Sequence, residues 1–405
     1  MVQNKLGLAY GVIIVVFTLL VSILFFENPG TNDVGIWLSW VANVTQYSLV
    51  EGYALNGADY PPFSSLILFW VGHIANSLHV DLFLAIKYSL LVTLCATSIV
   101  FYFWTRQLLL TIMFHFALLL SSVGLGYLDI YFVPWLIFAF WALQKNRWLL
   151  FTLSLSIAIL IKWQALIFLP FVCLYFLQID RPTQWRSIPL RRIVWQVFIP
   201  AVTLAVLALV WFGPEVINAF LRATTGHHYL SANALNMNWI ITYILHTFLP
   251  TLYGVDMKII QLPQTAVLYT VIKNVFIIAY TLVFLKFCLV KKTYENLLVY
   301  SVLGSSAYFM MNTGTHENHL FIAVILASFL AAIQTHYRPL FIIAALSMNI
   351  NLAIFYFGTL FVTDKIGPLP MTVAFALLNS VIFLLFYYFV MSQDFIKTVK
   401  KLWQQ

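Results

Sequence analysis

Charged residues are scarce in this chain. Only 8% of its 405 residues are Asp, Glu, Lys or Arg, whereas 62% are hydrophobic and the mean hydropathy is +0.93. A soluble domain is about 25% charged, because most of its outer residues face water. The composition therefore excludes a soluble globular fold of this size and predicts an all-α polytopic membrane protein.

Cysteine is also rare, and its placement excludes two common kinds of site. Cys95, Cys173 and Cys288 each lie inside an apolar run, which provides neither a disulfide framework nor the spacing of a metal site. The sequence also lacks a Gly-rich phosphate loop, a Rossmann fingerprint and an HExxH motif. We therefore expect no cofactor, no metal and no nucleotide-sugar site.

Long apolar runs are abundant. A spanning helix needs about 20 apolar residues, and about twelve runs meet or approach this length. They cover residues 6–26, 83–104, 107–124, 130–144, 148–161, 163–178, 193–213, 265–287, 294–311, 320–335, 339–357 and 370–391. We expect a single integral membrane domain over 1–405 with two large extracytoplasmic loops, 27–82 and 214–264.

The 21 basic residues predict how the chain is oriented in the membrane. With about twelve spans and both termini in the cytoplasm, most of these residues fall on the cytoplasmic side, as the positive-inside rule requires. The net charge of +8 then reflects topology, and we do not expect nucleic-acid binding. This orientation requires the segments 62–80 and 236–253 to lie in the membrane interface or to enter the bilayer only part-way.

The first large loop contains a predicted amphipathic helix over 34–52. Apolar residues recur there at helical spacing, namely Ile36, Trp37, Trp40, Val41, Val44 and Tyr47. Tryptophan is typical of helices at a membrane interface. We therefore expect this helix to lie on the membrane surface.

The few acidic residues narrow the choice of catalytic groups. Of the 13 Asp and Glu residues, we expect Asp33, Asp59, Asp129 and Glu317 on the extracytoplasmic side, at the ends of predicted spans. A carboxylate in a partly apolar site can serve as a general base, because desolvation raises its pKa. The alternative for each residue is a helix cap or a solvated side chain.

Several cations are expected on the same side. Lys162 follows a short apolar span, where an ammonium group needs a partner or an anionic ligand. Together with Arg222 and His316 it is a candidate to bind a phosphate whose lipid tail lies in the bilayer. The alternatives for Lys162 are a structural ion pair with Asp129 or a snorkelling side chain. His227 is either a further phosphate ligand or half of a solvated histidine pair.

Short motifs occur in a fixed order between about residues 30 and 320. They are Asp33 ahead of the predicted amphipathic helix, Asp59-Tyr60-Pro61-Pro62, Gly126-Tyr127-Leu128-Asp129, Lys162-Trp163-Gln164-Ala165, Ala232-Asn233-Ala234-Leu235-Asn236-Met237-Asn238-Trp239 and Thr315-His316-Glu317-Asn318. In this arrangement the chain resembles the GT-C superfamily of polytopic glycosyltransferases. The closer likeness is to the glucosyltransferase branch of N-glycan assembly and its prokaryotic relatives. Asn318 stands where that branch has a lysine.

The resemblance implies an inverting transfer of a hexose, glucose or mannose, from a polyprenyl- or dolichyl-phosphate carrier. Asp33 would remove the proton from an acceptor hydroxyl while the hydroxyl oxygen attacks the anomeric carbon of the sugar. The candidate ligands for the donor phosphate are Lys162, Arg222, His316 and His227. The candidate residues for the sugar and the acceptor are Asp129, Gln164, Asn236, Trp239, Glu317, Asp59 and Tyr60. This scheme requires no metal.

The partners that follow are membrane lipids, the lipid-phosphate sugar and a glycan, glycolipid or protein acceptor. The active site would be extracytoplasmic, at the plasma membrane of a prokaryote or the endoplasmic reticulum of a eukaryote. A transporter or flippase of lipid-linked sugars is one alternative, although the sequence has no inverted repeats. A polysaccharide polymerase or ligase is a second alternative. Its outer loops would be expected to be rich in arginine, whereas Arg222 is the only arginine predicted in the outer loops of this chain.

Overall fold

The computed structural model describes residues 15–179, 186–255, 257–357 and 365–392, and nearly all regular structure in these ranges is helical. This confirms the predicted all-α fold class. Within the described ranges, the two-residue strands β1 (Lys365–Ile366) and β2 (Leu369–Pro370) form a small antiparallel pair. The predicted cytoplasmic termini fall in 1–14 and 393–405, outside the described residues.

Among the described residues, five helices are long and apolar enough to cross a membrane. They are Leu82–Thr105, Leu190–Phe212, Val267–Leu289, Thr335–Tyr356 and Met371–Ser392. Shorter apolar helices cover Val15–Leu24, Leu108–Gly124, Leu128–Gln144, Trp148–Ile161, Trp163–Leu177 and Phe321–Ile333. These helices are compatible with a membrane protein, while the number of about twelve spans and their orientation remain predictions.

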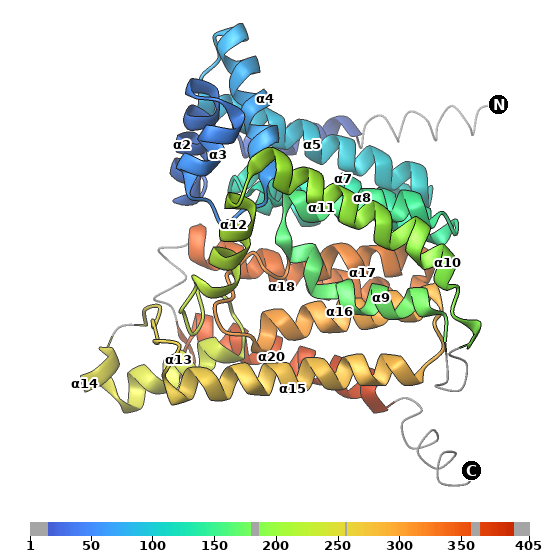
Figure 1. Ribbon diagram of the computed structural model, residues 1–405. Coiled ribbons are helices and arrows are strands. Elements are labelled where there is room, and N and C mark those ends of the chain that lie inside the picture. Colours follow the sequence, from blue (N-terminus) through green and yellow to red (C-terminus); the bar gives the residue numbers. More distant parts are fainter. Residues whose placement is uncertain (1–14, 180–185, 256, 358–364, 393–405) are drawn as a thin grey trace, which may run out of the picture. The chain divides into compact units, whose positions relative to one another are not determined.

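The chain forms two compact units, the first of which contains residues 1–165 and 191–226. Its helices are α2 (Asp33–Gln46), α3 (Leu49–Asn56), α4 (Pro62–Leu78), α5 (Leu82–Thr105), α6 (Leu108–Leu119), α7 (Val133–Gln144), α8 (Trp148–Ile161), α10 (Leu190–Ile193), α11 (Ile199–Phe212) and α12 (Glu215–Thr225). Within this unit α2, α3 and α4 pack on one another, and α7 packs along α8 (Figure 1).

The predicted amphipathic helix over 34–52 is in fact two helices, α2 and α3. The backbone leaves the helical region at Tyr47, and Ser48 then caps α3. The Ser48 hydroxyl accepts a hydrogen bond from the Glu51 amide, while the Glu51 carboxylate accepts one from the Ser48 amide. This capping box satisfies two backbone donors and starts a new helix, which reverses the chain so that α3 packs against α2.

Irregular turns interrupt three of the apolar segments beside candidate site residues. A π-helical turn at Leu120–Gly124 ends α6, and a 3₁₀ turn at Leu128–Phe132 carries Asp129 into α7. A second 3₁₀ turn, Trp163–Phe168, follows Lys162. Such turns redirect the backbone at the end of a helix. They lie where consecutive predicted spans meet, and they carry Asp129 and Lys162 between those spans.

The second unit contains residues 166–190 and 227–405. Its helices are α9 (Leu169–Leu177), α13 (Met237–Phe248), α14 (Pro250–Tyr253), α15 (Val267–Leu289), α16 (Tyr294–Met311), α17 (Phe321–Ile333), α18 (Arg338–Tyr356) and α20 (Met371–Ser392). Nearly every side chain of α17 is buried, and this helix packs against both α16 and α18 (Figure 1). A helix that is apolar on all sides is suited to such an interior position.

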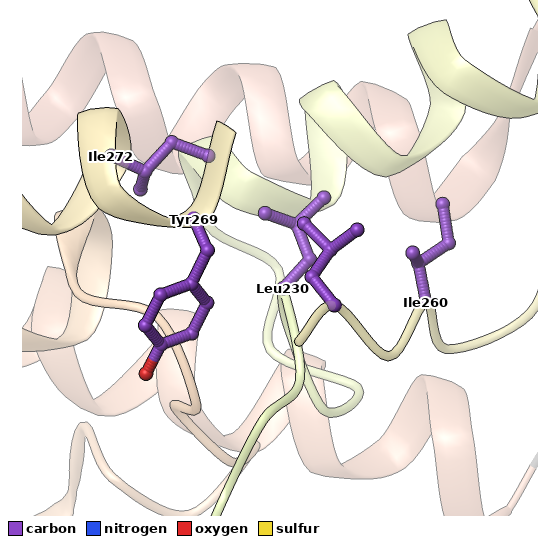
Figure 2. Packing of buried hydrophobic residues seen from close by; sticks show 5 residues of the cluster. Leu230, Ile260, Tyr269 and Ile272 are labelled. Carbon is purple, nitrogen blue, oxygen red and sulfur yellow. The ribbon is translucent and has the colours of Figure 1, made fainter. Parts of the chain in front are cut away.

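A buried apolar cluster fixes the segment that leads into α13. Leu230, Ile260, Tyr269 and Ile272 come together there, with Leu262 as the fifth member (Figure 2). The amide of Leu230 donates to the carbonyl of Ile260 at 2.9 Å, so the two segments lie side by side. Burial of each such side chain stabilises by about 1.5–3 kcal/mol. The cluster therefore anchors the residues that directly follow His227.

Candidate functional site

The first group of candidate residues lies entirely within the first unit. Its members are Asp33, Tyr60, Asp129, Lys162 and Asp59, which we call the acidic cluster. Asp33 begins α2, Asp59 and Tyr60 precede α4, Asp129 lies in the turn before α7, and Lys162 ends α8. All five are predicted site residues, and the fold brings them together although they span about a third of the chain.

An ion pair lies at the centre of this cluster. The Lys162 Nζ is 2.8 Å from the Asp129 Oδ1, and the Asp129 side chain has 0% exposure. Lys162 also hydrogen-bonds the Tyr60 hydroxyl, and its Nζ lies 3.7 Å from the centroid of the Tyr60 ring. A buried carboxylate needs a compensating charge. The structure therefore has the pair with Asp129 that was one of the alternatives for Lys162.

Asp33 is the carboxyl group best suited to accept a proton. It is half-buried, and burial is the main cause that raises its pKa above the ordinary value of 3.8. The charge of Lys162 lowers this pKa, whereas the negative charges of Asp129 and Asp59 raise it. The net effect is a raised pKa. A carboxylate in this state is a stronger base than an ordinary Asp.

Close backbone contacts hold the start of α2 against the turn before Asp129. The Thr31 amide donates to the Leu125 carbonyl at 3.0 Å. Gly30 and Gly126 both have positive φ, and a Cβ on either would lie under 3.0 Å from the Val34 side chain. Glycine is required where the backbone has this conformation and approaches so closely. These contacts bring the Asp33 and Asp129 segments side by side.

The tryptophans of α2 face Tyr60. Trp37 and Trp40 make edge contacts with the Tyr60 ring, at centroid distances of 5.2 and 5.5 Å. Both tryptophans are buried, so they differ from the membrane-facing side chains that the amphipathic pattern predicts. The spacing of three residues in the sequence shows that they share a helix face, but it does not show what covers that face. Their contact with Tyr60 could not be found from the sequence.

Gln164 is a buried amide with unused hydrogen-bonding capacity. Its side chain is in the turn after Lys162, and the residue is 7% exposed. Neither its Oε1 nor its Nε2 has a hydrogen-bond partner among the residues that the structure describes. Leaving such groups unpaired costs free energy unless a ligand or water satisfies them. Gln164 can therefore both accept a hydrogen bond from a bound hydroxyl and donate one to it.

Arg222 is engaged with protein groups. Its Nε and Nη2 donate to the Ala58 carbonyl at 3.0 and 2.6 Å, and its Nη2 forms an ion pair with Glu215. The sequence analysis missed Glu215. The signal available was the spacing of seven residues, which places Glu215 and Arg222 on one face of an amphipathic α12.

The second group lies in the other unit and contains His227, Tyr229, His316 and His319, which we call the histidine cluster. The His316 ring is 4.9 Å from that of His227 and 5.2 Å from that of His319. Backbone bonds from Gly314 to Tyr229 and from Ala232 to Thr315 hold the two segments together. Two predicted phosphate ligands, His227 and His316, are therefore neighbours, and His319 is a further member that the predictions did not include.

Glu317 follows His316 in the sequence, and its side chain is buried. It is hydrogen-bonded to a residue outside the histidine cluster. The Tyr356 hydroxyl of α18 donates to the Glu317 Oε1 at 2.5 Å. The His316 backbone amide donates to the His319 Nδ1 at 3.2 Å, so that this nitrogen carries no proton. Within the turn between α16 and α17, one hydrogen bond thus links Glu317 to α18 and another links His316 to His319.

Asn236 and Trp239, both predicted to bind the sugar or the acceptor, are buried inside the protein. The Asn236 side chain caps α13 by accepting from the Trp239 amide at 3.0 Å, and its Nδ2 donates to Phe309 and Thr315. Trp239 is 2% exposed and packs in an apolar cluster with Leu235 and Val373. Both residues therefore stabilise the fold around the histidine cluster.

In the described part of the chain, no group of three or more His, Cys, Asp or Glu side chains has an arrangement that could hold a metal ion. Comparison with known proteins gives no direct guide to either cluster: no protein-family model matches the chain, and no curated protein matches it.

Proposed function

We propose that the chain is an inverting glycosyltransferase of the GT-C type. It transfers a hexose, glucose or mannose, from a polyprenyl- or dolichyl-phosphate carrier to an acceptor hydroxyl on the extracytoplasmic side of a membrane. The observation that carries the proposal is the half-buried Asp33 carboxyl, whose pKa is raised by burial beside the Lys162–Asp129 pair. The order of the sequence motifs and the long apolar helices support it.

The proposed reaction has one chemical step. The Asp33 carboxylate takes the proton of the acceptor hydroxyl, and the hydroxyl oxygen forms a bond to the anomeric carbon. The bond from that carbon to the phosphate oxygen breaks, and the lipid phosphate leaves with the electron pair. Hydrogen-bond donors placed at the leaving phosphate lower the barrier.

Recognition of the sugar or acceptor is assigned to Gln164. Its buried amide has a donor and an acceptor without partners among the described residues, and a hydroxyl group can satisfy both. The Asn236 amide already bonds protein groups. Gln164 is therefore the better candidate of the two.

The experiment that tests the function uses the purified full chain in liposomes with labelled glucosyl- or mannosyl-phosphoprenol. We expect free polyprenyl phosphate to be released only when a glycan or glycolipid acceptor is also present. A chain that moves the labelled lipid between leaflets but transfers no sugar would instead be a transporter. Formation of long polymers would indicate the polymerase or ligase alternative.

The charges around Asp33 predict how transfer depends on pH. Asp33 must be ionised to accept a proton, so the rate falls as the pH drops through its raised pKa. In Asp59→Asn a charge that raises this pKa is absent, so the acid limb of the kcat profile moves to lower pH. In Lys162→Met the charge that lowers the pKa is absent, so the limb moves to higher pH.

The pH profiles are compared with those of the wild type and of Asp81→Asn as a matched control. Asp81 is exposed and caps α5 through bonds from the Phe83 and Leu84 amides, a role that asparagine also fills. Its substitution should leave the acid limb unchanged. Shifts of both test variants in the same direction would rule out Asp33 as the titrating base.

A further inference from the structure

Three consecutive backbone carbonyls of the segment before α4 are each bound by a side chain. The Ala58 carbonyl accepts from Arg222 of α12, and the Asp59 carbonyl accepts from the Trp163 Nε1 at 3.0 Å. The Tyr60 carbonyl accepts from the Tyr53 hydroxyl of α3 at 3.1 Å. Donors from three separate elements thus hold the backbone that carries two members of the acidic cluster.

Arg222 makes the strongest of these attachments. It donates twice to one carbonyl, and bonds from a charged donor are about twice as strong as neutral ones. Glu215 orients the guanidinium and itself accepts from the Asn218 Nδ2 at 3.0 Å. Burial opposes ionisation of Glu215, but the bonds from Asn218 and Arg222 outweigh it, so its pKa is lowered. Arg222 therefore faces a carboxylate that balances its charge.

An arginine that is balanced in this way is poorly suited to bind a phosphate. Its charge already faces Glu215, and two of its donor nitrogens point to Ala58. The Ala58 carbonyl is one residue from Asp59 and two from Tyr60, whose hydroxyl bonds Lys162. A short chain of contacts thus connects α12 to the centre of the acidic cluster.

We propose that Arg222, oriented by Glu215, is a positioning residue that holds the Ala58–Tyr60 backbone so that Asp59 and Tyr60 keep their places beside Asp33 and Lys162. This proposal rests on the proposed function, because the residues it positions are those of the transfer site. It replaces a direct role of Arg222 at the donor phosphate. The surrounding apolar contacts of Tyr53, Phe212, Val216 and Ala219 give α12 a firm base for this role.

The kinetic test compares Arg222→Gln with Arg192→Gln. Arg192 is a matched control, because its Nη2 also donates to a backbone carbonyl, that of Asn146, at 2.5 Å. For Arg222→Gln we expect kcat to fall about 10–100-fold with the donor KM unchanged, since misplaced groups slow the chemical step. Arg222→Lys should recover part of the loss. A raised donor KM with unchanged kcat would instead indicate a phosphate ligand and overturn the proposal.

A charge-swapped variant separates carbonyl binding from the ion pair. Glu215→Arg combined with Arg222→Glu keeps opposite charges at the two positions, but a glutamate at 222 cannot donate to the Ala58 carbonyl. We expect kcat to remain as low as in Arg222→Gln. Full recovery would show that only the ion pair matters and would overturn the proposal.

A labelling experiment tests the positioning without any need for transfer activity. Ala58 is 2% exposed, so Ala58→Cys, in a chain whose three native cysteines are replaced by serine, should react slowly with a maleimide. We expect Arg222→Gln to speed labelling about tenfold, as loss of a charge-assisted bond predicts, and Arg192→Gln to leave it unchanged. Unchanged labelling in Arg222→Gln would overturn the proposal. Faster labelling in a chain that transfers no sugar would leave it standing and reject the proposed function alone.

Discussion

Replacement of Asp33 by asparagine should lower the rate of sugar transfer about 10²–10⁴-fold, the range that general-base catalysis contributes. Asparagine has nearly the same shape but cannot take a proton from the acceptor hydroxyl. Because burial raises the pKa of Asp33, its ionised form is disfavoured in the folded state, so loss of the charge should leave the folded state at least as stable as before. The measurement is release of labelled polyprenyl phosphate, alongside the apparent melting temperature.

Asp81→Asn again provides the control, because it makes the same change at an exposed helix cap. It should transfer sugar at the wild-type rate. If Asp33→Asn kept full activity, another group would have to be the base. If it lost activity and also melted at a much lower temperature, the loss would reflect unfolding and the comparison would have to be repeated with Asp33→Glu, for which retained folding and a reduced rate are expected.

Replacement of Lys162 by methionine should destabilise the first unit by about 3–5 kcal/mol, the usual cost of removing one partner of a buried ion pair. Asp129 is fully buried and 2.8 Å from the Lys162 ammonium, and methionine removes that charge while keeping most of the side-chain volume. The measurement is the apparent melting temperature of the purified chain. Lys145→Met, at an exposed lysine, should change stability by no more than about 0.5 kcal/mol.

A double variant separates charge compensation from packing. Asp129→Asn combined with Lys162→Met removes both charges and should be more stable than Lys162→Met alone, because the buried negative charge is removed together with its counter-charge. If the double variant were less stable than either single variant, packing around these side chains, and not their charges, would dominate. That result would contradict the role assigned to the pair.

The helical fold class and the members of the acidic cluster could be predicted from the sequence. Scarce charge in an apolar chain makes each polar residue conspicuous, because a buried polar group costs free energy unless it is paired or used. Asp33, Asp59, Asp129 and Lys162 were identified on this ground. The structure brings them together in one unit through the contact between Gly30 and Leu125 and the bond from Lys162 to Asp129.

Other features of the fold and of the site depend on contacts that the hydrophobic periodicity of the sequence does not predict. The apolar pattern over 34–52 does not show that Ser48 and Glu51 form a capping box and begin a second helix. The helical spacing of Trp37 and Trp40 does not show that they pack on Tyr60. Arg222 carries a charge that the sequence assigns to a phosphate, and only the fold shows Glu215 and Ala58 beside it.

The histidine cluster also depends on contacts that could not be predicted from the sequence. His227 and His316 are far apart in sequence, and each alone could be a solvated side chain. Backbone bonds at Gly314 and Ala232 and the apolar cluster of Leu230 and Ile260 bring the two segments together. Pairing of short irregular segments leaves no periodic signal in the sequence, so Tyr229 could not be included in the predicted site.

The anomeric configuration of the transferred sugar tests the central claim most directly. Attack by an acceptor oxygen that is activated by Asp33, on the face opposite the leaving phosphate, inverts the anomeric carbon. NMR of the product made from a donor of one defined anomer should therefore show the opposite anomer. A product that keeps the configuration of the donor would require either two successive displacements through a covalent sugar intermediate or attack from the same face as the leaving phosphate. Either route would contradict the account of Asp33 as the base of a single inverting displacement.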